Sequence, residues 1–247
     1  MIVTLITDFG SGEYVGAMKG VIYSNCPDVK IVDITHDIEK FNVRNAAASV
    51  FASCPHFPEG SVHLVVVDPG VGTERRGVII KTKSHYYVGP DNGVFSLLAD
   101  VQKVYEIRSE SKSKTFHGRD VFAPIAAKLA CSESPSEFGE ETSNIKRIIK
   151  KPKIKNGVIE GEVIAVDAFG NIITNITDVG RIGYGDAVKL QINDETKKIK
   201  FVESYGFAKK GELVCLIGSS GLLEVAVREG DAGKLLDVKS GETIVIR

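Results

Sequence analysis

The chain has 247 residues, of which 43% are hydrophobic, and this is enough to bury a sizeable core in one large domain or two modest ones. Its formal net charge is −1, so no overall field would steer it to nucleic acid or to an anionic membrane, and we expect neither partner. No apolar run reaches the roughly 18 residues that a membrane-spanning helix needs, so we expect no membrane span.

The first half of the chain alternates between strand-like and helix-like segments. The pattern predicts strands at 2–7, 29–34 and 61–67, a hairpin at 77–81 and 85–88, and helices at 13–24, 43–54, 94–99 and 121–131. The segment 61–67 is almost continuously apolar, as is typical of a strand buried on both faces of a parallel sheet. We therefore expect an α/β layered domain with a largely parallel sheet over residues 1–150.

A polar stretch follows this alternation. Residues 132–141 are polar and acidic, and residues 146–155 are strongly basic and include Pro152. The loss of periodicity predicts a surface linker at the domain boundary. Nucleic-acid binding is the other interpretation of the basic run, but the run is short and lacks interleaved aromatic residues.

The last third of the chain reads as short strands separated by turns. The strands are expected at 162–166, 172–176, 187–192, 199–202, 213–217, 223–226 and 243–246. No long amphipathic helix interrupts them. The pattern predicts a smaller, all-β, barrel-like domain over residues 156–247, with a sandwich as the alternative.

The four cysteines, Cys26, Cys54, Cys131 and Cys215, are spread over the whole chain. Zinc sites and disulfide frameworks usually cluster their cysteines, so we expect four reduced, mostly buried thiols and no metal site. The chain starts with a strand-like segment that runs into a glycine-containing turn, and no charged region precedes it. This start does not resemble a signal peptide, and reduced thiols are typical of the cytoplasm, so we expect a cytoplasmic protein.

Two predicted strands end in an acidic residue followed by a turn that contains glycine. Asp8 follows the first strand and Asp68 follows the strand at 61–67, and ligands of open α/β sheets bind beyond such strand ends. The Asp8 carboxylate could accept both hydroxyls of a ribose, or it could cap the next helix. Asp68 and Arg75 could form a site, or they could make an ordinary ion pair across a structural turn.

His117 precedes a predicted helix and lies beside a glycine, so it would be partly exposed and could titrate near neutral pH. A structural histidine is the alternative. His36 and Asp37 resemble a turn that closes a strand. In the β domain, the loop Asp167–Asn171 and the Gly218–Gly221 turn could line an adenine or amino-acid pocket, in which Phe169 would stack, or they could be two β-turns.

Taken together and in order, these segments resemble one family, the S-adenosylmethionine hydroxide adenosyltransferases, which are relatives of the bacterial fluorinase and chlorinase. The similarity spans both domains. The matching segments are TDFG (7–10) with YVGAMKGVI, HDI (36–38), VVVDPGVGTERR (65–76), GPDNGVF (89–95), TFHGRDVFAP (115–124), DAFGNIITNI (167–176) and GSSGLLEVA (218–226).

The resemblance implies hydrolysis of S-adenosylmethionine to adenosine and methionine, without a metal or a cofactor. It also implies a homotrimer whose sites lie at subunit interfaces. The implied roles place Asp68, Arg75 and His117 as a triad around the attacking water and Asp8 on the ribose hydroxyls. The remaining implied substrate contacts are Asn171 and Phe169 at the adenosine, Asp167, Ser219 and Glu224 at the methionine end, and Val227 at the base.

Two positions argue against halogenation, the nearest alternative activity. Halide-using relatives carry a tyrosine where this chain has Asp68, and the fluorinase carries a serine where this chain has Gly118. A carboxylate would repel a halide anion, but it can accept a hydrogen bond from water.

Two further alternatives stay open at this point. A dinuclear-metal phosphoesterase could use Asp8, His36, Asp37, Asp68 and His117 as ligands, although none of their spacings is a recognised ligand motif. A non-catalytic module that binds adenosine is the other alternative. The resemblance suggests the R form at sulfur as substrate, and the residues themselves do not indicate which epimer fits.

Overall fold

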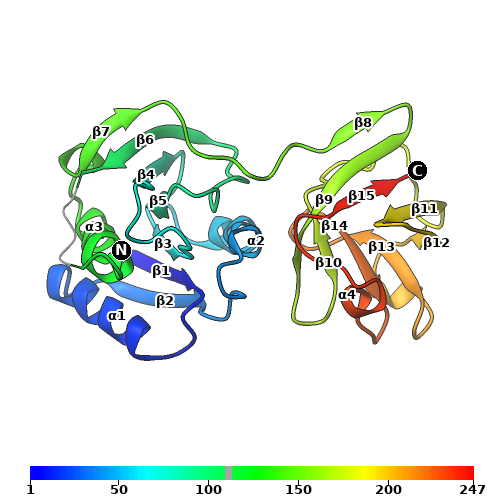
Figure 1. The fold of residues 1–247 in the computed structure, drawn as a ribbon, viewed down its shortest axis with the longest axis horizontal. Helices are drawn as coiled ribbons and strands as arrows, with labels where there is room; N and C mark the ends of the chain where they lie inside the picture. The colour runs from blue at the N-terminus through cyan, green and yellow to red at the C-terminus, as the bar shows by residue number, and fades with distance from the viewer. Residues whose placement is uncertain (109–112) are drawn as a thin grey trace. The chain divides into compact units, whose positions relative to one another are not determined.

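The computed structural model of the chain describes residues 1–108 and 113–247. The chain divides into two compact units, Met1–Ile148 and Ile149–Arg247, and each unit has its own hydrophobic core. Figure 1 shows that the first unit combines helices and a sheet, whereas the second consists almost wholly of strands.

Unit 1 is built on a seven-stranded sheet. In their order across the sheet, the strands are β2 (Lys30–Thr35), β1 (Ile2–Thr7), β3 (Val62–Val66), β5 (Tyr86–Pro90), β4 (Gly77–Thr82), β6 (Val101–Ile107) and β7 (Gly139–Thr142). The three pairings from β2 to β5 are parallel, and the three from β5 to β7 are antiparallel. The sheet is therefore mixed, and the expectation of a largely parallel sheet is not confirmed. A parallel pairing needs a long crossover connection, but β4 and β5 are joined by a tight turn.

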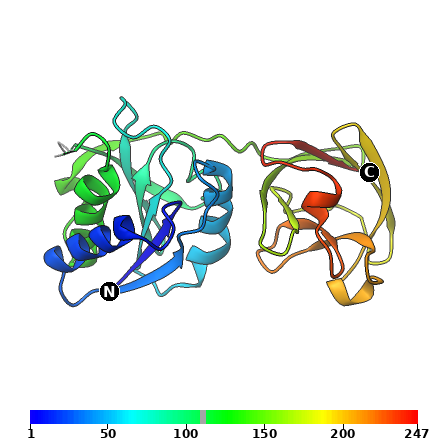
Figure 2. The ribbon, with the colours of Figure 1, turned by 60° about the horizontal axis from the view of Figure 1, so that its bottom comes forward.

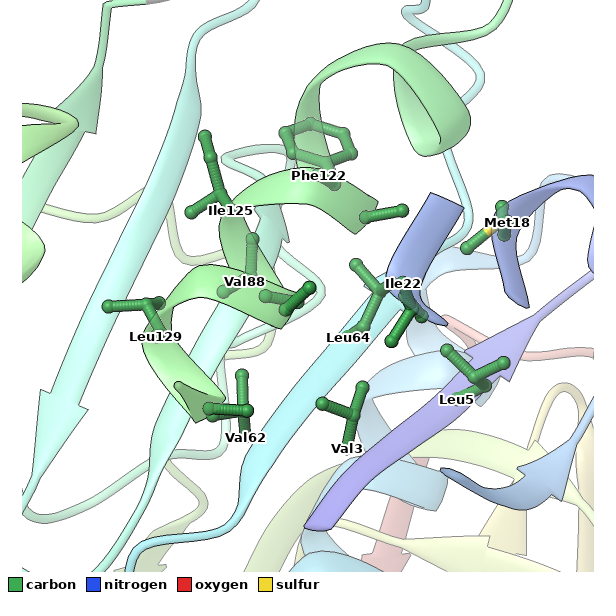
Figure 3. Packing of buried hydrophobic residues seen from close by; sticks show 14 of the residues in the cluster. Val3, Leu5, Met18, Ile22, Val62, Leu64, Val88, Phe122, Ile125 and Leu129 are labelled. Carbon is green, nitrogen blue, oxygen red and sulfur yellow. The ribbon is translucent and has the colours of Figure 1, made fainter. Parts of the chain in front are cut away.

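Helices cover both faces of this sheet. Figure 2 shows α1 (Glu13–Asn25) and α3 (Ala123–Ala130) on one face and α2 (Val43–Ser53) on the other. Side chains alternate between the two layers: Leu5 packs with the cluster under α1 and α3, and Ile6 packs with the cluster under α2. Figure 3 shows the first of these clusters, in which the labelled side chains are Val3, Leu5, Met18, Ile22, Val62, Leu64, Val88, Phe122, Ile125 and Leu129.

A disulfide bond joins Cys26, which follows α1, to Cys131, which follows α3. The expectation of four reduced thiols is therefore wrong for this pair. The two helices pack side by side, so their ends meet although the cysteines are 105 residues apart in the sequence. Cys54 and Cys215 are free and buried, as expected.

The helix expected at 94–99 is replaced by turns. The carbonyl groups of Ser96 and Leu98 accept hydrogen bonds from the Arg147 guanidinium, which holds this segment against a residue about 50 positions away in the sequence. Gly93 has a φ of +108°, which does not fit a helix start. The segment is therefore ordered by contacts with a distant residue that local periodicity does not reveal.

The polar stretch expected as a linker at 132–141 also differs from expectation. Its last residues form β7, which pairs with β6 at the edge of the sheet. The strand is largely solvent-exposed, so it lacks the alternation of apolar residues that marks a half-buried strand.

Unit 2 is a closed β-barrel, so the barrel expected from the sequence is confirmed and the alternative of a sandwich is not. Its strands are β8 (Lys153–Lys155), β9 (Val158–Val166), β10 (Ile172–Thr174), β11 (Ala187–Ile192), β12 (Glu195–Phe201), β13 (Leu213–Ile217), β14 (Leu223–Val227) and β15 (Thr243–Ile246). The barrel closes because β10 pairs with both β14 and β9, and β8 extends the sheet beyond β9 as an edge strand. One short helix, α4 (Ala232–Leu235), is capped by Asp231, whose side chain accepts the N–H of Lys234.

Candidate active site

Asp8 and Asp68 follow neighbouring parallel strands. β1 and β3 pair in register, with Thr7 opposite Val66, so the chain leaves both strands at the same edge of the sheet. This is the edge at which open α/β sheets bind ligands. The fold therefore brings together the ends of two motifs that are 60 residues apart in the sequence.

Asp68, Arg75 and His117 form one connected cluster. The Nε atom of Arg75 donates to both carboxylate oxygens of Asp68, at 2.9 and 3.0 Å, and Nη2 donates to Oδ2 at 2.5 Å. The same Nη2 lies 2.9 Å from Nδ1 of His117. The side chains of Arg75 and Asp68 are only 11% and 5% exposed, so this ion pair is largely buried.

The electrostatics of the cluster favour an uncharged His117. Burial lowers the pKa of His117 below its ordinary value, the positive charge of Arg75 lowers it further, and Asp68 and Asp120 partly oppose both effects. A guanidinium has no acceptor, so Nδ1 of His117 accepts from Arg75 and the neutral ring carries its proton on Nε2. The cluster thus presents a carboxylate, a fixed cation and an imidazole N–H.

The loop from Asp68 to Arg75 can adopt its path because of a glycine. Gly72 has a φ of +77°, and a Cβ atom there would overlap the backbone carbonyl of Lys114. Glycine therefore permits both the left-handed backbone and the close approach to the segment that leads into His117. The Phe122 ring lies beneath the Arg75 guanidinium, with 5.0 Å between the guanidinium carbon and the ring centroid.

Asp8 is almost buried, and its Oδ2 accepts the N–H of Phe41 at 2.9 Å. A carboxylate has about four acceptor positions, so this bond leaves capacity for a diol. His36 supports the same loop: its Nδ1 lies 2.9 Å from Oγ1 of Thr7, and its carbonyl accepts the N–H of Gly10. These contacts give His36 a structural role here.

An aromatic group that sequence reasoning did not single out adjoins two of these motifs. Phe9, Tyr14 and Phe116 pack edge to face or tilted, with ring centroids 5.3 to 5.8 Å apart, and Tyr14 is about half exposed. The Arg119 guanidinium lies over Phe116 and pairs with Asp120. Phe9 follows Asp8 directly and Phe116 precedes His117. This adjacency to two candidate site residues was the sequence signal from which the aromatic group could have been found.

In unit 2, Asp167 and Asn171 close a rigid turn. Asp167 Oδ1 accepts the backbone N–H groups of Phe169 and Asn171 at 2.8 Å, and Oδ2 accepts the Asn171 side-chain amide at 2.9 Å. The carbonyl of Gly170 accepts two N–H groups from the start of α4. Phe169, at the tip, is 81% exposed and so presents a free ring face.

Glu224 is a buried carboxyl group close to Asp167. Burial raises its pKa, a hydrogen bond from Tyr205 lowers it, and the negative charge of Asp167 raises it. The Tyr205 hydroxyl donates to Oε2 of Glu224 at 2.5 Å, and the carboxyl group packs against Gly218. Two carboxyl groups this close together can bind a cationic group of a ligand, because its positive charge offsets the repulsion between them. Tyr205 lies outside every motif, so no sequence signal could have found it.

Two of the expected unit 2 residues lie on neighbouring features. Ser219 is exposed in the turn from Gly218 to Gly221, which is closed by a 2.9 Å backbone hydrogen bond. Val227 ends β14 and is half-buried. The expected residues thus fall into one group in unit 1 and one group in unit 2.

The described parts of the chain, 1–108 and 113–247, contain no group of three or more His, Cys, Asp or Glu side chains arranged to hold a metal ion. Within the same ranges, no helix is both long and apolar enough to cross a membrane.

Comparison with known proteins gives a consistent result. Residues 3–139 match the family model for the SAM hydroxide adenosyltransferase N-terminal domain, and residues 161–245 match that for the C-terminal domain. The chain is 41% identical to an (R)-S-adenosyl-L-methionine hydrolase of Methanocaldococcus jannaschii, over 96% of this chain and 92% of the relative. It is 26% identical to a fluorinase of an Actinoplanes species, over 99% and 97%. The crystal structure of an uncharacterised conserved protein from Thermotoga maritima superposes with a TM-score of 0.89 at 38% identity, covering 100% of this chain and 99% of that one.

Proposed function

The chain belongs to the SAM hydroxide adenosyltransferase family, and from that premise we propose that it uses water to split S-adenosylmethionine, in the R form at sulfur, into adenosine and L-methionine. The observation that carries this proposal is the cluster of Asp68, Arg75 and His117 at the carboxyl edge of the parallel strands. A carboxylate, a fixed cation and an imidazole N–H are suited to hold and activate one water molecule.

The chemistry needs little help at the leaving group. The water oxygen bonds to the 5′ carbon of the ribose as the carbon–sulfur bond breaks, and the bonding electron pair leaves with sulfur. Methionine departs as a neutral thioether, so no general acid is required. The demanding part is to present the oxygen in line with the carbon–sulfur bond and to take one proton from it.

The three side chains divide this task. Asp68 accepts a hydrogen bond from the water and takes its proton, because the neutral His117 already holds a proton on Nε2. His117 orients the water oxygen with that N–H group. Arg75 fixes both partners and stabilises the negative character that develops on the attacking oxygen.

The remaining contacts follow from the family resemblance. Asp8 holds the ribose hydroxyls, while Phe169 and Asn171 line the adenosine pocket with the backbone near Val227. The methionine end faces Asp167, Ser219 and Glu224, and the two carboxyl groups suit its α-ammonium group.

We also propose that the protein is a homotrimer and that two subunits supply the contacts to each substrate molecule. Light scattering of the purified protein would test the oligomeric state.

Halogenation is the closest alternative, and two observations count against it. Asp68 would repel a halide. A Cβ atom at Gly118 would lie 3.0 Å from Val66, 3.3 Å from Phe116 and 3.4 Å from Met18, so a halide-binding serine has little room there.

The test is to incubate chelator-treated protein with each sulfonium epimer, with and without chloride, and to separate the products. Adenosine and methionine from the R epimer, unaffected by chloride or chelator, are expected. A halogenated nucleoside, loss of activity on chelation, or adenosine binding without turnover would each contradict the proposal.

The cytoplasmic location stays a prediction, and its argument from reduced thiols no longer holds because Cys26 and Cys131 are paired.

A further inference from the structure

One motif of the family resemblance has no role in the proposed chemistry. The segment GPDNGVF contains the end of β5 and the two polar residues that follow it, Asp91 and Asn92. Asp91 is buried, with 7% of its surface exposed. Burying a carboxyl group is costly unless its oxygens find donors, so the partners of this residue indicate what it does.

Asn92 binds the chain immediately before Asp68. Its side-chain amide donates to the carbonyl of Val67 at 2.8 Å, and its side-chain oxygen accepts the N–H of Val94 at 3.2 Å. The carbonyl of Val67 belongs to the peptide unit that links Val67 to Asp68. The entry of the loop that carries Asp68 and Arg75 is thus fixed by one side chain.

Asp91 binds the chain immediately after Arg75. Its backbone N–H donates to the carbonyl of Arg76 at 2.9 Å, and its Oδ2 accepts Nε of Arg76 at 2.6 Å. Its Oδ1 accepts the N–H of Lys146 at 2.7 Å, so the carboxylate is itself held in place. The exit of the same loop is therefore fixed by the neighbouring residue.

The sheet explains why two adjacent residues can reach both ends of this loop. β3 and β5 are parallel neighbours, so Val67 and Asp91 leave the sheet at the same edge. β4 is antiparallel to β5, with Gly77 opposite Pro90, so Arg76 enters the sheet at that edge too. The loop 68–76 starts and ends on either side of the point where β5 releases Asp91 and Asn92.

We propose that Asp91 and Asn92 are positioning residues that clamp the two ends of loop 68–76 and so keep Asp68 and Arg75 aligned with His117. The clamp rests on the proposed function, because alignment matters only if the triad does chemistry. Catalytic rates are sensitive to displacements of about 1 Å, which can lower them about a hundredfold. Neither residue touches the triad side chains in the contacts described above, so both act through the backbone and Arg76.

The first test is Asn92→Ala, read out at His117 in the absence of substrate. The groups that face His117 are Arg75, which lowers its pKa, and Asp68 and Asp120, which raise it. If the clamp releases the loop, Arg75 moves away and water enters, so the pKa of His117 should rise towards its ordinary value. Histidine-labelled protein titrated by NMR measures this shift, with the signal assigned by loss in His117→Asn.

The second readout is kinetic. Asn92→Ala should lower kcat about 10- to 100-fold while KM for S-adenosylmethionine changes less than threefold, because the triad is misaligned and the binding residues are intact. Asp91→Asn is the isosteric companion variant. It keeps the oxygen that accepts from Lys146 and removes the charge that faces Arg76. Like Asn92→Ala, it should raise the pKa of His117 and lower kcat.

The matched control is Asn175→Ala in unit 2. Asn175 also donates to a backbone carbonyl, that of Lys150 at 2.7 Å, and accepts a backbone N–H, that of Glu162 at 2.8 Å. The control should lose comparable thermal stability and leave the pKa of His117 unchanged. An unchanged His117 pKa in Asn92→Ala and Asp91→Asn would overturn the clamp, as would an equal shift in the control. If the wild-type protein does not hydrolyse S-adenosylmethionine, the proposed function fails, and the His117 titration still decides the clamp.

Discussion

The Nη2 atom of Arg75 lies 2.9 Å from Nδ1 of His117, so a permanent donor faces the ring nitrogen of a titratable side chain. Protonation of His117 would place an N–H group at Nδ1, and two donors would then oppose each other. The contact between these two residues is therefore compatible only with the neutral imidazole. This makes the state of the triad dependent on pH.

The pH dependence of turnover follows from this contact. Because burial and Arg75 lower the pKa of His117, the acid limb of kcat should lie below pH 6.5, the ordinary pKa of histidine. Any stability that the neutral ring contributes is likewise complete above 6.5 and is lost as the pH falls through the lowered pKa. A kcat profile from pH 4 to 8 tests this, and an acid limb unchanged in His117→Asn would contradict it.

Replacing Arg75 should affect turnover more than binding. Arg75→Lys keeps one positive charge but loses the fork that holds both Asp68 oxygens, so kcat should fall about 100- to 1000-fold with little change in KM. Adenosine release under saturating substrate measures the effect. Arg108→Lys is the control, because the Arg108–Glu140 pair is exposed. A raised KM at unchanged kcat would argue against a role in the chemical step.

The hydroxyl of Tyr205 should tune substrate binding through Glu224. Its hydrogen bond lowers the pKa of Glu224, so Tyr205→Phe should raise that pKa and leave less negative charge for the α-ammonium group. We expect KM to rise about tenfold, more at acidic pH, at nearly constant kcat. Tyr184→Phe removes a hydroxyl from an exposed tyrosine elsewhere and should leave KM unchanged. Equal KM values for the two variants would show that Tyr205 does not contribute to substrate binding.

The disulfide should stabilise unit 1 substantially. Cross-linking residues 105 apart restricts the unfolded chain, and loops of this length correspond to about 4–5 kcal/mol. Denaturant unfolding of Cys131→Ser against the wild type measures the loss. Thiol titration of the unreduced, denatured protein should find only Cys54 and Cys215, and a count of four thiols would show that the bridge does not form.

His63 should make the protein sensitive to acid. This histidine is fully buried, and burial, followed by the charge of His85, lowers its pKa to about 3. The unfolded chain binds its proton near pH 6.5, so stability from His63 is complete above 6.5 and is lost as the pH falls towards 3. The slope should be about 1.4 kcal/mol per pH unit. Unfolding free energies of His63→Gln should show a smaller loss over this range, and parallel curves would refute the assignment.

Several elements could be predicted because their signals are local. The expected bounds of β1 agree with the structure, and those of α1, α2 and β3 agree within one residue at each end. Asp68 and Arg75 share a short loop, so their pairing was one of the open interpretations of the sequence. His117 lies 42 residues beyond Arg75, and only the family resemblance placed it in the same cluster.

The features that could not be predicted depend on packing between distant segments. Cys26 meets Cys131 only because α1 and α3 lie side by side. The wide spacing of the cysteines in the sequence had instead predicted that all four thiols are reduced. Tyr205 reaches Glu224, which lies 19 residues further along the chain, without belonging to any motif. β7 is polar because it lies at the edge of the sheet, so periodicity misidentified it as linker.

The basic run that the sequence placed in a linker contains β8, the edge strand of the barrel, and this placement bears on solubility. An edge strand offers unpaired backbone groups to which a strand of another molecule can add. Lys153 and Lys155 are exposed on β8, and Pro152 stands directly before it. A second copy approaching in register would have to bring like charges together beside a residue without a backbone donor. The lysines of this segment are thus placed to disfavour edge-to-edge pairing with a second barrel, although Lys153 also pairs with Glu160 of the same chain.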